Sequence, residues 1–467
     1  METTNTSEHN KQFLYFIATI AAIGGLLFGF DTGVISGALI FIKDQFQPGT
    51  WWLEFVVSST VLGAGLGALV SGHIADRFGR RRIIIIAALA FIIGTALAAV
   101  ANSIGMIIVG RFVLGVAIGI ASYASPLFIS EVSPAHKRGA MVLLNGIGIT
   151  GGQVFSFLID YLLADWHAWR LMIAIGLIPA FVLLIGMFFA PNSPRWLMLA
   201  GYSDQAKKVL KKICASEHVE EGIQQIEESI RTEKKHRFSE IFHKRFRPVL
   251  IIGLGLGIFQ QLMGINTVMY YGPSIFGQIG FAGDKAQILG TFGLGVVNML
   301  VTIFTLMTVD KWGRRKLLLS GTFIAFISLM SIAWLNKTPP NTTTEILSVF
   351  FLISYITGYS MSIGSLFWLI IAEIFPLSIR GQAMGFVAGI QWGANFVVSS
   401  TFLSLLHAVG GSQTFLIYAL MTFCACFFCY KMVPETKDVS LETIEHNLST
   451  GTKARYLGSH PGNVSQF

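Results

Sequence analysis

The chain has 467 residues and a formal net charge of +8, yet only 12% of its residues are charged and 53% are hydrophobic. A soluble globular domain carries about 25% charged residues, so this composition excludes that class. Apolar stretches of about 18 or more residues recur along nearly the whole sequence, which is typical of a protein that crosses a membrane many times.

These apolar stretches predict twelve membrane-spanning segments. Lipid offers no hydrogen-bonding partners, so backbone groups must be satisfied within each segment, which predicts α-helices. Basic residues gather in alternate loops, and the positive-inside rule then places both chain ends on the cytoplasmic side of the cell membrane. This topology explains the positive charge better than nucleic-acid binding does. The predicted spans cover residues 13–42, 52–75, 83–101, 106–130, 139–164, 170–190, 248–277, 286–309, 317–335, 346–374, 382–407 and 414–432.

The first span contains a single charge, Asp31, in the stretch FGFDTGVISG. An Asp at the bilayer centre costs roughly 2.5–3.5 kcal/mol on insertion scales, which makes it a functional candidate. Arg111 in span four stays protonated and needs a counter-charge. We place Arg111 near the cytoplasmic part of its span and expect it to pair with Asp31. A third deep charge, Asp160, is expected toward the outer end of span five.

The environment expected for Asp31 suggests a proton-binding role. A neighbouring guanidinium favours the ionised carboxylate, whereas burial favours the neutral acid. We therefore hypothesise that Asp31 takes up a proton from outside, loosens its hold on Arg111, and releases the proton inside. The alternative is a static ion pair that only fixes two helices.

Three charged motifs occur twice, each time at the same point of a six-span unit. DRFGRRR (76–82) matches DKWGRRK (310–316), EVSPAHKR (131–138) matches EIFPLSIR (373–380), and PNSPR (191–195) matches PETK (434–437). The offsets are 234, 242 and 243 residues. Such a repeat predicts two six-helix bundles of like topology.

The repeat and the spans together predict the domain organisation. The soluble linker has apolar residues at helical spacing, as in Ala206, Val209, Leu210 and Ile213, and predicts short amphipathic helices, the second at roughly 219–235. We expect a cytoplasmic tail at residues 1–12, an N-terminal bundle at 13–193, a cytoplasmic helical linker at 194–247, a C-terminal bundle at 248–433 and a cytoplasmic tail at 434–467.

The charges of the repeated motifs predict ion pairs between helices at the cytoplasmic face. Exposed pairs are worth only about 0–1 kcal/mol each, but a network can bias one conformation. We hypothesise that they close the cytoplasmic side while the outside is open. The alternative is that they are solvated loop charges that set topology. The gate candidates are Asp76, Arg80, Arg81, Glu131, Arg138, Arg195, Asp310, Arg314, Arg315, Glu373, Arg380 and Glu435.

The stretches GRR after DR, PxSPR, QQLMGIN and PETK resemble the sugar porter family of the major facilitator superfamily, and the resemblance covers essentially residues 10–445. It implies an all-α membrane protein of twelve transmembrane helices in two pseudo-symmetric six-helix bundles, working by alternating access on a hexose or pentose bound between the halves. Symporters of the family carry Asp in FGxDxxVxSG, which supports proton coupling through Asp31.

A sugar site needs side chains that both donate and accept hydrogen bonds, with an aromatic ring for the C–H face of the sugar. The alternative is that the intramembrane amides only hold helices together. The candidates that match the family's binding positions are Gln260, Gln261, Asn266, Tyr271, Asn298, Trp368, Gln391, Trp392 and Asn395.

Three positions depart from the family pattern. Gly146 replaces a Gln in span five, which removes one hydrogen-bonding arm and leaves room for a bulkier or differently oriented ligand. Ser365 replaces a Pro in span ten, from which we expect a helix that bends less easily. Asn192 replaces a Glu in PNSPR, from which we expect a weaker network in the N-terminal half.

The sequence thus predicts a proton-coupled symporter of a monosaccharide, acting as a monomer in the lipid bilayer. Three alternatives stay open: an uncoupled sugar facilitator, a proton symporter of a non-sugar polyol such as inositol, and a sugar sensor that does not transport. We identify no nucleotide-binding loop, metal cluster or nucleophile constellation, so neither an enzyme nor a cofactor is expected.

Overall fold

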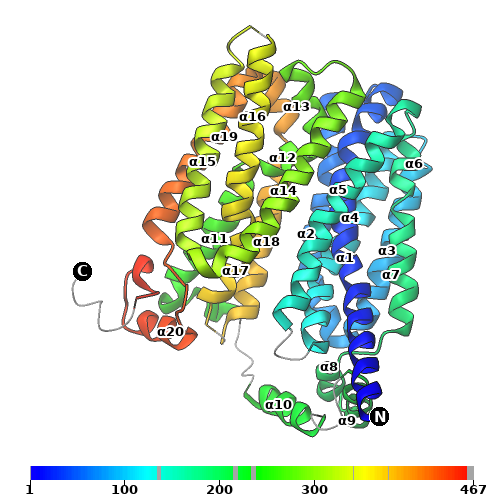
Figure 1. Cartoon of the computed structure of the whole chain (residues 1–467), viewed down its shortest axis with the longest axis vertical. Helices are drawn as coiled ribbons and strands as arrows, with labels where there is room; N and C mark the ends of the chain where they lie inside the picture. Colours follow the sequence, from blue (N-terminus) through cyan, green and yellow to red (C-terminus); the bar gives the residue numbers. More distant parts are fainter. Residues whose placement is uncertain are drawn as a thin grey trace. The chain divides into compact units, whose positions relative to one another are not determined.

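The computed structural model describes residues 2–133, 138–213, 219–232, 238–339, 341–376 and 378–459. Over these ranges the chain is built of helices and connecting turns, with no strand (Figure 1). It divides into two compact units, Met1–Lys234 and Lys235–Phe467. In the described part of the chain, eleven helical segments are long and apolar enough to cross a membrane.

The first unit is a bundle of helices whose faces are largely apolar. In it α1 packs against α5, α2 against α4, and α3 against both α4 and α7. The sixth predicted span is formed by two helices in succession, α6 and α7. The helices are α1 (Glu2–Phe46), α2 (Thr50–Phe78), α3 (Arg80–Ala99), α4 (Ile104–Val132), α5 (Arg138–Leu163), α6 (Trp169–Ala174) and α7 (Leu177–Phe189).

The second unit repeats this plan with more interruptions. The seventh predicted span is divided into three helices, and the tenth contains a π-helical turn, η5, between two α-helices. The helices are α11 (Arg247–Leu262), α12 (Ile265–Tyr270), α13 (Gly272–Ile279), α14 (Asp284–Trp312), α15 (Arg314–Leu335), α16 (Thr342–Tyr359), η5 (Ser360–Gly364), α17 (Ser365–Ile374), α18 (Arg380–Ser399) and α19 (Phe402–Met432).

The eleventh predicted span, 382–407, does not correspond to any of these eleven segments. It consists of α18 and the first turns of α19, because the chain turns at Gly410, whose φ of 82° interrupts α19. The face of α18 carries the amides Gln391 and Asn395, and these lower its hydropathy. The amides that make α18 less apolar than the other spans also make it a candidate for binding.

Two glycines make the tight turns that begin the repeated motifs. Gly79 joins α2 to α3 with φ of 91°, and Gly313 joins α14 to α15 with φ of 84°. These are left-handed conformations that residues with a Cβ rarely adopt. A Cβ at Gly79 would also lie 3.1 Å from the Trp196 ring. The turns therefore fix Arg80 and Arg314 as the first residues of their helices.

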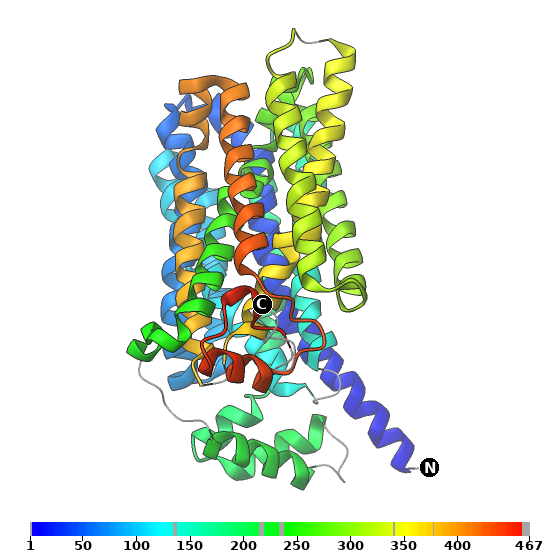
Figure 2. The ribbon, with the colours of Figure 1, turned by 90° about the vertical axis from the view of Figure 1, so that its left-hand side faces the viewer.

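Three short helices follow the first bundle: α8 (Pro194–Leu199), α9 (Ser203–Ile213) and α10 (Val219–Thr232). The four apolar residues predicted to share a face of α9 are all buried. Contacts of α9 with α1 and of α8 with α4 hold this group against its own unit. Figure 2 shows it gathered at the end of the unit where α1 begins.

Helical segments occur in both predicted tails, 1–12 and 434–467. At the N-terminus α1 is already helical from Glu2, and the segment TTNTSEHNKQ contains neither Gly nor Pro to stop the helix. Beyond α19, the chain forms α20 (Leu441–Ser449). The buried Asn447 side chain donates to the carbonyls of Leu457 (2.9 Å) and Ser459 (2.8 Å) and folds the tail back on α20.

Candidate functional site

Asp31 of α1 and Arg111 of α4 form the predicted pair. Arg111 Nη1 donates to Asp31 Oδ1 at 2.9 Å, and Nη2 lies 3.4 Å from Oδ2. Arg111 Nε donates to the carbonyl of Val56 on α2 at 2.7 Å. The two side chains are only 4% and 3% exposed. One guanidinium therefore links three helices: α4 to α1 through a carboxylate that is nearly closed off from solvent, and α4 to α2 through a backbone carbonyl.

The predicted depth of Arg111 is wrong. Arg111 lies in the second turn of α4, which begins at Ile104 directly after α3 has crossed the bundle from Gly79. Its partner Val56 lies in the second turn of α2, at the same end. Because α4 runs back toward the Gly79 end, an early position on it lies far from that end. The pair is thus remote from the charged loop motifs.

Two further carboxylates are buried in this unit. Asp160 on α5 is fully buried; its Oδ2 accepts a hydrogen bond from the backbone N–H of Gly37 at 3.2 Å, and its Oδ1 has no partner among the described residues. Glu54 on α2 is 1% exposed and was not predicted as a deep charge. Its place beside WWL at the start of a span resembles that of an interfacial residue, so its burial could not be predicted from its neighbours.

Four amides of the second unit are joined in one chain of hydrogen bonds, which we call the amide cluster: Gln260, Gln261, Asn266 and Gln391. Asn266 Nδ2 donates to Gln261 Oε1 at 2.6 Å, and Gln261 Nε2 lies 3.4 Å from Gln260 Oε1. Gln391 Nε2 of α18 donates to the same Gln260 oxygen. The cluster therefore connects the seventh and eleventh spans.

The helix breaks explain how the amide cluster assembles. Gly264, with φ of 87°, separates α11 from α12 and changes the direction of the chain between Gln261 and Asn266. On the other side, Gln260 Nε2 donates to the carbonyls of Ile363 (3.2 Å) and Gly364 (3.4 Å), which the π-helical turn of the tenth span exposes. Irregular backbone inside a membrane protein is tolerated where such side chains satisfy it.

The tenth span is interrupted although it lacks the family's prolines. Ser362 has the non-helical angles φ −111° and ψ −113°. The hydroxyl of Ser365 donates to the carbonyl of Ser360 at 2.6 Å, and the hydroxyl of Ser360 donates to Asn298 Oδ1 on α14 at 2.6 Å. From the missing proline we expected a helix that bends less easily. The structure instead has a bend here, whose backbone is satisfied by serine hydroxyls.

The other predicted binding residues lie in different surroundings. Asn395 is buried on α18, one turn after Gln391, and its Oδ1 has no partner among the described residues. The Trp368 side chain is exposed and contacts Phe367 edge-on, while Trp392 is half-buried. Tyr271 is 1% exposed, donates to the carbonyl of Ser399 at 2.8 Å and stacks on Phe402. Tyr271 therefore packs the core, so we assign it no role in binding.

Gly146 of α5 faces open space. A Cβ built at this position meets nothing within 4 Å, whereas one at Gly148, on the same helix, would lie 2.9 Å from the carbonyl of Ala22. The preceding Asn145 is buried, and its Oδ1 has no hydrogen-bond partner in the described structure. Position 146 therefore has room for a side chain.

The charged motifs of the first unit form a network around Arg80. Its guanidinium contacts Glu131 Oε2 at 3.0 Å and the exposed Asp76 at 3.1 Å. Glu131 also accepts a hydrogen bond from Ser193, the residue that caps α8. Arg81 donates instead to the carbonyls of Met187 (2.9 Å) and Phe188 (2.7 Å) at the end of α7. These bonds join helix ends within one bundle.

The second unit repeats this network at the matching positions. Arg314 contacts Glu373 at 2.8 Å and Asp310 at 2.9 Å, and Thr436 takes the place of Ser193 by donating to Glu373. Arg315 donates to the carbonyls of Val433 (3.0 Å) and Tyr430 (2.7 Å). The hydroxyls of Ser193 and Thr436 were not predicted, although their common offset of 243 residues was visible in PNSPR and PETK.

The remaining gate candidates differ in their contacts. Glu435 accepts hydrogen bonds from four backbone N–H groups, those of Arg314, Arg315, Thr436 and Lys437, at 2.9–3.1 Å. Arg380 Nε donates to the carbonyl of Phe375 at 3.0 Å, and burial lowers the pKa of this guanidinium while Glu445 opposes the shift. Arg195 belongs to α8, and its side chain is not without an interaction partner. The side chain of Arg138 lies outside the described residues.

Neither unit suggests a metal site. Within the described ranges, no group of three or more His, Cys, Asp or Glu side chains lies close enough together to hold an ion. The polar features that remain are a buried ion pair, an amide cluster on broken helices and charged networks at helix ends.

Comparison with known proteins gives the family. A family model described as "Sugar (and other) transporter" matches residues 17–448. A D-xylose transporter of Levilactobacillus brevis is 40% identical over 96% of this chain and 98% of its own. The galactose-proton symporter of Escherichia coli is 36% identical over 97% of this chain and 98% of its own.

Solved structures agree with this assignment. The partially occluded inward-open form of the xylose transporter XylE from E. coli matches with a TM-score of 0.81 and 31% identity, covering 92% of this chain and 100% of that chain. The chain therefore belongs to the sugar porter family of the major facilitator superfamily and is a multi-pass membrane protein with the twelve-helix fold of that family.

Proposed function

We propose that the protein is a proton-coupled symporter of a monosaccharide, a hexose or pentose, that works by alternating access. The observation that carries this proposal is the buried pair of Asp31 and Arg111, with 2.9 Å between Nη1 and Oδ1. An ionisable pair deep in a membrane bundle is expensive to keep and is therefore expected to serve function. The names of its relatives, which include D-xylose, galactose and arabinose carriers, support the substrate class.

In this mechanism a proton from outside neutralises Asp31. The neutral acid holds Arg111 less strongly, and the guanidinium keeps its bond to the carbonyl of Val56. The links from α1 to α4 then weaken, and the loaded carrier can turn inward. Release of the proton inside restores the pair. The proton thus acts on the first unit by changing one contact between helices.

The sugar is proposed to bind at the amide cluster, together with Asn298 and Asn395 and the rings of Trp368 and Trp392. Primary amides both donate and accept, so a sugar hydroxyl can exchange with an amide of the cluster without leaving either unpaired. Asn395 supports this role because its buried oxygen has no partner among the described residues. The open space at Gly146 is proposed to admit a ligand group that an amide side chain at this position would exclude.

The networks around Arg80 and Arg314 are proposed to form the cytoplasmic gate, with the chain ends and the 194–247 linker on the same side. Their pairs tie α3 to α4 and α15 to α17, so each bundle can move as a rigid body. Unchanged transport and unchanged labelling from the inside in Arg138→Ala and Arg380→Ala variants would show that these two arginines take no part in closure.

Uptake into proteoliposomes across a panel of sugars and polyols, with and without an imposed proton gradient, tests the proposal. We expect at least one monosaccharide to accumulate above its external concentration only when the interior is alkaline. Uptake that merely equilibrates would indicate a facilitator. Accumulation of inositol and of no sugar in the panel would indicate a polyol symporter, and absence of any flux would favour a sensor.

A further inference from the structure

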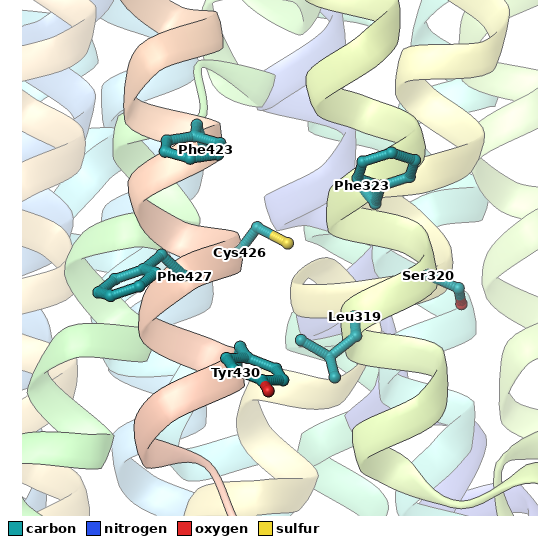
Figure 3. A pocket seen from close by; sticks show the side chains of 7 residues that line it. All are labelled: Leu319, Ser320, Phe323, Phe423, Cys426, Phe427 and Tyr430. Carbon is teal, nitrogen blue, oxygen red and sulfur yellow. The ribbon is translucent and has the colours of Figure 1, made fainter.

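An apolar groove of about 470 Å³ lies between α15 and α19, in the second unit. Leu319, Ser320 and Phe323 of α15 form one wall, and Phe423, Cys426, Phe427 and Tyr430 of α19 form the other. Figure 3 shows the sulfur of Cys426 pointing from α19 into the gap toward α15. The groove shares no lining residue with the sugar and proton sites described above.

The groove runs along the membrane-spanning part of both helices. From Tyr430 to Phe423 it covers two turns of α19, about 10 Å at 1.5 Å per residue. The rings of Phe323, Phe423 and Phe427 are all more than half exposed. In a bilayer such a groove is in contact with lipid, and its apolar walls are suited to a hydrocarbon chain.

Basic side chains surround one end of the groove. The guanidinium carbon of Arg315 lies 5.7 Å from the centre of the Tyr430 ring, and that of Arg455 lies 4.8 Å from the same ring. The ammonium of Lys431 lies 5.8 Å from the Phe427 ring. Lys316 is exposed one helical turn before Ser320 and thus on the groove side of α15. Four cations therefore gather where the apolar walls end.

These cations have little local compensation. Arg315 and Arg455 repel one another, and Arg455 forms no ion pair with any carboxylate in the described part of the chain. Glu435, the carboxylate beside Arg315, is occupied by four backbone N–H groups. Two guanidiniums on one tyrosine ring without a free carboxylate leave a place for an anion.

We propose that this groove binds an anionic phospholipid, with one acyl chain between α15 and α19 and the phosphate between Arg455, Arg315 and Lys316. Arginine recognises phosphate through several N–H donors, and each basic residue near the membrane surface strengthens anionic-lipid binding about fivefold. The lipid would link α19 to the folded C-terminal segment, because Arg455 belongs to the turn Ala454–Tyr456.

Native mass spectrometry of the purified full chain with phosphatidylglycerol and phosphatidylcholine tests this site. We expect the wild type to retain phosphatidylglycerol at least tenfold more strongly. Arg455→Gln should weaken it about fivefold, and Cys426→Trp, which fills the groove, should remove the preference. Leu319→Trp fills it from the opposite wall and serves if Cys426→Trp does not fold, as judged by thermal unfolding.

Two matched controls separate the site from general effects. Lys453→Gln removes an exposed charge two residues from Arg455, and Met307→Trp adds a ring at an exposed position of α14; both should bind as the wild type does. Equal losses in Lys453→Gln and Arg455→Gln, or normal binding with the groove filled from both walls, would refute the proposal. So would displacement of the lipid by equimolar glycerol phosphate, since the ligand would then be a phosphate without acyl chains.

Discussion

Arg111 holds Asp31 with two N–H groups and the carbonyl of Val56 with a third, so one side chain joins α4 to α1 and α2. The contacts differ in kind. The bond to Val56 does not depend on protonation, whereas the bonds to Asp31 weaken when the carboxylate is neutralised. Protonation of a single group can therefore weaken the polar link between α1 and α4 while Arg111 stays anchored to α2.

Asp31→Asn should abolish uphill sugar accumulation while leaving exchange of preloaded sugar. Asn has nearly the shape of a protonated Asp but cannot bind or release a proton at physiological pH. The accumulation ratio in proteoliposomes with an imposed proton gradient should fall to about one, and counterflow should persist. Asp44→Asn, at an exposed position of the same helix, is the control. Normal accumulation by Asp31→Asn would exclude coupling through this carboxylate.

Arg111→Ala should reduce stability, and part of the loss should depend on Asp31. Removing one partner of a buried ion pair leaves an uncompensated charge, at a cost of about 3–5 kcal/mol. Here it also leaves the carbonyl of Val56 without its side-chain donor. Thermal unfolding in detergent should show a large loss for Arg111→Ala and partial recovery in the double variant Arg111→Ala, Asp31→Asn. Additive losses in the double variant would contradict the pairing as the cause.

The sequence was sufficient for the helices and for the pairing of Asp31 with Arg111, because hydrophobic length and the scarcity of charges in lipid leave few alternatives. The repeats also predicted where Arg80 and Arg314 lie. What the sequence could not supply was the interruption of helices. Gly264 was visible but its positive φ was not, and the bend at Ser362 depends on hydroxyl contacts with Asn298 and between neighbouring turns.

The same limit explains the uneven result for the candidate site. Gln260 and Gln261 lie at the end of α11, where the span breaks, and there they meet Gln391 of α18; periodicity on a continuous helix does not predict this break. Tyr271 looked equivalent to these amides by composition, but its ring packs on Phe402. The depth of Arg111 was misplaced although counting the direction of the spans would have corrected it.

Gln260→Ala should weaken sugar binding in addition to lowering stability. The amide accepts from Gln391 and donates to two carbonyls of the π-helical turn, and a lost neutral hydrogen bond is worth about 0.5–1.5 kcal/mol. The KM should rise about threefold to tenfold. Tyr271→Phe should lower stability, because it loses the bond to Ser399, and leave KM unchanged. If Gln260→Ala lowers the unfolding temperature and leaves KM unchanged, the amides only join helices.

Gly146→Gln should alter sugar selectivity. The position is open, so the side chain fits, and one new hydrogen bond of about 0.5–1.5 kcal/mol would change the KM of a sugar that reaches it twofold to tenfold. Gly151→Gln on the same helix is equally open and is the matched control. Both replacements should raise helix stability, but only the first should change the ratio of KM values across the sugar panel. Equal ratios would place position 146 away from the sugar.

The two units differ at the matched pair Asn192 and Glu435, and this difference predicts opposite effects of exchanging their side chains. Glu435 accepts from four backbone N–H groups, two of them at the start of α15. Asn192 Oδ1 is buried and has no partner in the described structure. A carboxylate at a helix N-terminus is worth about 0.3–1 kcal/mol, and up to about 2 when partly buried.

Asn192→Glu should therefore raise the unfolding temperature of the protein, and Glu435→Asn should lower it by more, because four donors then compete for one neutral oxygen. Repulsion from Glu131 opposes this gain. In the second unit, however, Glu435 tolerates the neighbouring Glu373, whose charge is paired by the Arg314 guanidinium at 2.8 Å, and Arg80 pairs Glu131 in the same way at 3.0 Å. Arg80→Gln in the Asn192→Glu background tests this directly: the gain should become a loss. A gain that survives the removal of Arg80 would show that backbone N–H groups alone stabilise the new carboxylate.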